Sequence, residues 1–176
     1  MNLIDCSYFY AGPLQIENAK PTDDIDNNAY AVQEAVTAYI ERYQGEFLRK
    51  MVGEDLAHMV EDYLAAVTEN EERRDEPGWE PYVDDHAETL CAKLRLSFAH
   101  YVYYKIAGDV NQQMTITGLM LMKSANGAQP PRQRMVRVWN DMVELNRRFV
   151  AWAEKEDGYA VFYHVEMITP INQYNL

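Results

Sequence analysis

The residues that most often bind metals are scattered along this chain. It has four histidines, and no two of them occupy the i, i+4 positions of a helical zinc site: His58, His86, His100 and His164. Its two cysteines, Cys6 and Cys91, are far apart and lie in no paired motif, so we expect free thiols in a reducing compartment. The sequence therefore predicts no metal site and no cofactor.

The possible nucleophiles also lack the neighbours that catalysis needs. Ser97 and Cys91 fall inside a predicted helix, and no Gly-x-x-x-x-Gly-Lys-Ser/Thr run is present to hold phosphates. Acidic pairs such as Asp84-Asp85 can divide acid and base roles when the two carboxyl groups have different environments. In an acidic helical chain such pairs are more typical of solvated helix faces. We therefore expect a protein that is not an enzyme.

Length and composition indicate one domain, residues 1–176. A hydrophobic content of 48% in 176 residues is enough for a single core. The net charge of −12 disfavours a protein that binds nucleic acid by neutralising phosphates, although an acidic surface can also line a passage through which DNA slides. The chain starts without a basic, apolar leader and has no membrane-spanning run, so we expect a protein made in the cytoplasm that contacts no membrane.

Apolar residues recur at spacings of three and four in four segments, which predicts a mainly α fold. The stripes cover residues 27–52, 54–67, 84–108 and 131–157, and Gly53 is expected to break the first two apart. Residues 109–130 lose the helical period and predict an extended loop or hairpin. We therefore expect a bundle of four to five helices over 27–157, with an N-terminal arm at 1–26 and a C-terminal tail at 158–176, of which 159–163 forms a short strand.

Several large apolar residues lie outside these stripes, in the arm, in the acidic loop near residues 69–81 and in the segment 109–130. Either they cover the chain's own core or they contact another subunit. These candidate contact residues are Tyr8, Phe9, Tyr10, Trp79, Leu119, Met120, Leu121 and Met122.

One segment resembles a known family. Residues 39–53 read YIERYQGEFLRKMVG, which is similar to the pattern x-Ile-x-x-Tyr-x-x-x-Phe-Leu-x-x-Leu-Leu-Gly that opens a family of tailed-bacteriophage neck proteins, the head–tail connectors or adaptors. Three further landmarks follow in the expected order: FAHYVYY at 98–104, TITG at 115–118 and RVWNDMV at 137–143. Met51 and Val52 replace the usual paired leucines, and residues 107–113 are less basic than the family pattern.

The resemblance implies a structural subunit of the virion neck. Such subunits form a homo-oligomeric ring, commonly twelvefold, that joins the portal at the capsid vertex to the tail components, and DNA passes through its lumen. The arms and the segment 109–130 would contact neighbouring subunits. The alternative is a small acidic helical protein-binding or regulatory module without catalysis, which recognises one partner through the helix from Trp139 to Trp152 or through its tyrosine-rich face.

Overall fold

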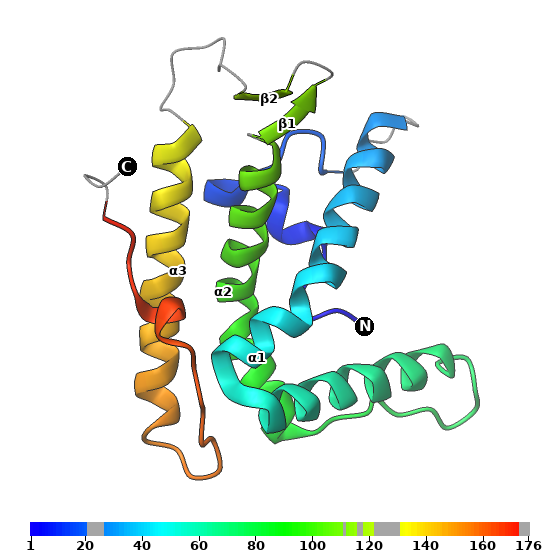
Figure 1. The fold of residues 1–176 in the computed structure, drawn as a ribbon. Coiled ribbons are helices and arrows are strands. Elements are labelled where there is room, and N and C mark those ends of the chain that lie inside the picture. The colour runs from blue at the N-terminus through cyan, green and yellow to red at the C-terminus, as the bar shows by residue number, and fades with distance from the viewer. Residues whose placement is uncertain (21–26, 111, 116–117, 122–130, 173–176) are drawn as a thin grey trace.

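The computed structural model describes residues 1–20, 27–110, 112–115, 118–121 and 131–172 (Figure 1). The predicted mainly α fold is confirmed. The described residues hold three α-helices: α1 (Asn27–Glu72), α2 (Asp85–Val110) and α3 (Pro131–Ala153). The expectation of four to five helices is not confirmed, because the two helices expected on either side of Gly53 form one element, α1, which is kinked at that residue.

The kink in α1 is a true interruption of helical geometry. Gly53 has φ 80° and ψ 177°, a combination that is nearly exclusive to glycine. After it the helix turns away from the bundle (Figure 1). The interruption leaves carbonyls of the preceding turn without amide partners in the helix, and backbone amides of the C-terminal segment bond to these carbonyls instead. The backbone amide of His164 donates to the Lys50 carbonyl at 2.8 Å, and that of Phe162 to the Val52 carbonyl at 3.5 Å.

Helix α2 lies between the first half of α1 and α3 (Figure 1). Its start is fixed by Asp84, whose Oδ1 accepts the backbone amides of His86 and Ala87 at 3.0 and 3.1 Å. Residues 97–103 of this helix are all buried. A helix packed on two sides has little surface left for solvent, so Ser97 and His100 are buried with it.

A two-stranded antiparallel hairpin follows α2 at its C-terminal end (Figure 1). Strand β1 (Gln112–Thr115) pairs with β2 (Gly118–Leu121), so that Gln112 stands opposite Leu121. The hairpin falls in the segment 109–130, for which the sequence predicts a loop or hairpin. Residues 122–130 of that segment lie outside the described part of the chain.

The chain after α3 differs from the prediction. The helix ends at Ala153 instead of near residue 157, and residues 159–163 form no strand. They run as an irregular segment into a 3-10 turn, η3 (Val165–Ile168), and the Phe162 amide bonds to the Val52 carbonyl of α1 instead of to a neighbouring strand. From here on, the name C-terminal tail refers to residues 159–172 of the tail predicted at 158–176. The tail lies along α3 (Figure 1).

The core combines all three helices with both ends of the chain. Leu3, Phe9 and Leu14 of the N-terminal arm and Met167 of the C-terminal tail are buried in the same cluster as Phe47 and Phe98. Within the described ranges, no helix is both long and apolar enough to span a membrane.

Candidate partner interface

The N-terminal arm folds back on its own bundle through two short 3-10 turns, η1 (Cys6–Phe9) and η2 (Gly12–Leu14). Phe9 is completely buried, so this predicted contact residue serves the chain's own core. Tyr8 and Tyr10 are half-buried beside it and keep part of each ring at the surface. Of the predicted aromatic cluster, two members therefore lie at the surface and one in the core.

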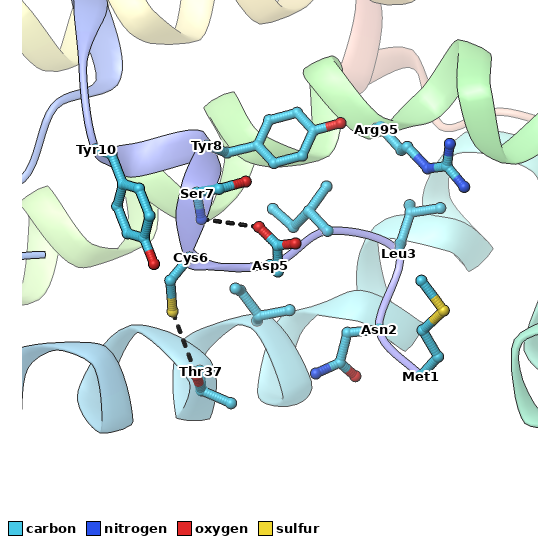
Figure 2. A pocket seen from close by; sticks show the side chains of 12 residues that line it. Met1, Asn2, Leu3, Asp5, Cys6, Ser7, Tyr8, Tyr10, Thr37 and Arg95 are labelled. Carbon is cyan, nitrogen blue, oxygen red and sulfur yellow. Dashed lines mark hydrogen bonds between the residues drawn. The ribbon is translucent and has the colours of Figure 1, made fainter. Parts of the chain in front are cut away.

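Tyr8 and Tyr10 line a pocket of about 670 Å³ between the arm, α1 and α2 (Figure 2). Its charged side chains already have partners inside the chain. The Arg95 guanidinium contacts both oxygens of Glu88, at 2.9 and 3.1 Å, and the Asp5 carboxylate accepts the Ser7 amide at 2.8 Å. Each of these contacts lies within a single element, and charges that are already paired leave little to recognise a charged ligand.

Helix side chains hold the arm by its backbone. Gln44 of α1 accepts the Leu3 amide at 2.6 Å, and Gln33 of α1 donates to the Ala19 carbonyl at 3.1 Å. Arg134 of α3 donates to the Pro13 carbonyl at 3.2 Å. The arm is thus fixed to two helices that are distant in sequence.

The C-terminal tail is held in the same way, and more completely. Asn140 pairs with both backbone groups of Ile171, donating to its carbonyl at 3.1 Å and accepting from its amide at 2.8 Å. Asn146, which is fully buried, donates to the Met167 carbonyl at 2.7 Å. Two further α3 side chains donate to tail carbonyls. Trp139 donates to the Thr169 carbonyl at 3.0 Å, and Arg147 donates to the Ile168 carbonyl at 3.0 Å. We call Trp139, Asn140, Asn146 and Arg147 the tail clamp.

An ion cluster joins the tail to α1 and α2. The Lys50 ammonium lies 2.8 Å from a carboxylate oxygen of Glu46 and 2.8 Å from one of Glu166 in η3. The Tyr101 hydroxyl donates to Glu46 at 2.8 Å, and the Lys105 ammonium lies 3.5 Å from the same carboxylate. The Glu46 carboxylate therefore connects α1 to α2, and the Lys50 ammonium connects α1 to the tail.

Electrostatics fix the protonation states of this cluster. Burial raises the pKa of Glu46, but the hydrogen bonds from Lys50 and Tyr101 and the charge of Lys105 outweigh it and lower the pKa to about 2. Burial and the hydrogen bond to Glu46 raise the pKa of Tyr101. A general acid or base works best with a pKa near the operating pH, and both groups are shifted away from neutrality. The cluster is suited to holding the tail rather than to moving protons.

The remaining predicted contact residues lie elsewhere. Trp79 is half-buried and donates its indole N–H to the Asn70 carbonyl at 2.8 Å, which fastens the acidic loop to the end of α1. Leu119, Met120 and Leu121 belong to β2, but their side chains lie outside the described part of the chain, as does all of Met122. Of the four predicted residues whose side chains the structure describes, Tyr8, Phe9 and Tyr10 lie in the N-terminal arm and Trp79 lies in the acidic loop.

The acidic pairs have structural partners. Asp84 caps α2, and Glu54 and Glu61 lie within ion-pair distance of Arg49 and His58. Among the described residues, no group of three or more histidine, cysteine, aspartate or glutamate side chains is placed to hold a metal ion.

The tail clamp is the feature that the sequence analysis missed. One signal was present: Asn146 lies at a core position between Met142 and Phe149, and a buried amide needs hydrogen-bond partners. The tail itself presents two large apolar side chains to solvent, Phe162 at 77% exposure and Val165 at 71%.

Comparisons of the chain with known protein families, with functionally described proteins and with solved structures give no match.

Proposed function

We propose that this protein is a structural subunit of a tailed-phage virion neck, a ring that joins the portal at the capsid vertex to the tail. The observation that carries the proposal is the structural role of each position in the segment that resembles the neck family. Its aliphatic and phenylalanine positions are buried, Tyr43 is half-buried, and the segment ends at the glycine whose geometry breaks α1: Ile40, Phe47, Leu48, Met51, Val52 and Gly53. The resemblance therefore rests on positions that the fold constrains.

Two further properties support a ring subunit. The N-terminal arm and the C-terminal tail pack against the bundle and are held by helix side chains, and the tail exposes Phe162 and Val165, which another subunit can cover. A net charge of −12 suits a lumen through which DNA passes without adhering. In this proposal the partners are further copies of the chain, the portal and the tail components, and DNA is cargo.

The proposal is tested by the mass of the purified protein, alone and mixed with a candidate portal protein, by light scattering and electron microscopy. We expect a closed ring of about twelve copies, alone or on the portal. A persistent monomer that does not bind the portal contradicts the proposal and favours the alternative, a small acidic module that binds one other protein.

A further inference from the structure

We propose that the tail clamp on α3 is an exchangeable peptide site that, in the assembled protein, holds the C-terminal tail of a second copy of this chain. The inference rests on the proposed function for its setting, a ring of identical subunits, and it names the contact that links them.

The first argument is how the clamp recognises the tail. Every tail group that the clamp contacts is a peptide group: the carbonyls of Met167, Ile168, Thr169 and Ile171, and the amide of Ile171. Main-chain hydrogen bonds give affinity for an extended segment wherever that segment comes from. The contacts that do depend on sequence, the buried Met167 side chain and the Glu166 to Lys50 ion pair, are identical in a second copy.

The second argument is the apolar surface of the bound tail. Phe162 and Val165 remain exposed although the neighbouring Met167 is fully buried. Exposed large apolar side chains mark surfaces that contact other proteins. When the tail reaches across to a second copy, the two chains meet at these side chains, and contact between subunits can cover them.

The third argument is the connector between α3 and the tail. Residues 154–158 are all exposed, and they end at Gly158, which has φ 94°. Exchange changes the backbone angles of this connector and conserves the contacts of the clamp, so the free-energy difference between the closed and exchanged forms is small and protein concentration decides between them. Exchange in one direction around a set of copies is head-to-tail, and it forms a ring when the rotation between copies closes and an open filament when it does not.

The test uses two full-length partners, each with one engineered cysteine. One carries Asn140→Cys and is labelled with heavy nitrogen, the other carries Ile171→Cys, and both carry Cys6→Ser. Cys91 stays in place, because burial raises its thiol pKa to about 11 and makes it unreactive in the folded protein. After mixing at assembly concentration and mild oxidation, the products are unfolded and weighed by mass spectrometry. Since each chain has one half of the pair, a disulfide of mixed mass forms only across two chains.

In the oligomer we expect mixed-mass disulfides to be the main disulfide product, because the disulfide restores the link between positions 140 and 171 that Asn140→Cys removes, and we expect few of them under dilute conditions. A full-length chain carrying both cysteines reports the competing arrangement within one chain. Intact rings in which this double variant closes only within single chains overturn tail exchange and leave the proposed ring in place. Absence of any oligomer overturns the exchange as well, and it is seen separately by light scattering as a failure of the proposed function.

Matched asparagine substitutions without the cysteines give a second readout. Asn140→Ala is expected to speed heavy-to-light subunit exchange about tenfold, because the two backbone bonds to Ile171 that must break during exchange are lost. The oligomer fraction should change little, since the closed and exchanged forms lose the same bonds. Asn70→Ala removes an equivalent pair of side-chain-to-backbone bonds in the acidic loop, to Glu80 and Tyr82, and is expected to leave the exchange rate unchanged. Equal effects of the two substitutions contradict the proposal.

Discussion

Single side chains far apart in sequence decide where the tail lies, and Glu46 is the clearest case. Its carboxylate accepts bonds from Lys50 and Tyr101, and Lys50 in turn reaches Glu166 in the tail. The pKa of Lys50 is raised by its hydrogen bonds to Glu166 and Glu46. Each ion therefore stabilises the charged form of its neighbour, and removing one carboxylate weakens the contacts of all three elements.

The substitution Glu46→Gln is expected to lower the free energy of unfolding by about 1 kcal/mol near neutral pH, a value kept small because the carboxylate is partly exposed and screened by solvent. The pKa of Glu46 is depressed from 4.5 to about 2 in the folded protein. Its contribution is therefore complete above pH 4.5 and is lost as the pH falls from 4.5 towards 2. Urea unfolding across this range should show the wild-type advantage shrinking with acidity.

The control for this prediction is Glu54→Gln, which removes a more exposed carboxylate paired with Arg49. Exposed pairs contribute little, so we expect a change within about 0.5 kcal/mol. A wild-type advantage over Glu46→Gln that stays constant between about pH 7 and about pH 3 would show that the carboxylate charge is not what holds the cluster together.

The residues of the core stripes could be predicted from sequence, whereas the residues of the tail clamp could not. Phe47, Leu90 and Phe98 recur with the helical period, and the period alone places them inside. Asn140 and Arg147 lie on the same helix as polar residues with no periodic signal, because their partners are peptide groups some 20 to 30 residues away. Hydrogen bonds to backbone groups require no particular side chain in the tail, so the tail sequence does not reveal them.

At the scale of elements, the break in α1 and the path of the tail depend on each other. The break frees carbonyls that the tail amides occupy, and the tail passes so close that a Cβ added to Gly53 would lie 3.2 Å from the Phe162 Cβ. Glycine is thus required twice at this position, for its positive φ and for the space beside it.

The substitution Gly53→Ala is expected to destabilise the protein by about 2 to 3 kcal/mol, since it adds backbone strain to a contact tighter than most. Thermal unfolding measures the loss. Hydrogen exchange gives the location: the amides of Phe162 and His164 should lose protection before those of α2 do.

Gly108→Ala provides the comparison, because Gly108 lies within α2 and an added Cβ would meet only a Met135 methyl at 3.5 Å. There alanine is expected to be neutral or to stabilise by up to about 1 kcal/mol. If both substitutions changed stability equally, the break at Gly53 would not carry the strain assigned to it.

The elements with a strong period were predictable, and those defined by distant partners were not. The start of α1, the break at Gly53 and the span of α2 agree with the sequence to within a few residues. The strand expected at 159–163 is wrong because an apolar, aromatic run favours a strand only when another strand is beside it. Here a broken helix end supplies the hydrogen-bond partners instead.

For the whole molecule, the balance between charge and apolar contact decides whether copies associate. The chain carries a net charge of −12, so copies brought together repel one another. The contacts proposed to join them are backbone hydrogen bonds at the tail clamp, the exposed Phe162 and Val165, and the Lys50 to Glu166 ion pair. Salt screens the ion pair but does not weaken the other two kinds of contact. Screening by salt should therefore remove the charge repulsion between copies and leave the apolar contacts and backbone hydrogen bonds that join them.

We accordingly expect assembly to increase when salt is raised from about 0.05 M to about 1 M, followed by sedimentation velocity at fixed protein concentration. Phe162→Ala should reduce assembly at every salt concentration with little loss of thermal stability, because that side chain is 77% exposed in the single chain. Leu96→Ala, on the exposed side of α2, is the matched apolar control and should assemble normally. Rings that dissociate in high salt would instead be held by ion pairs between subunits, and the apolar tail would then not be the joint.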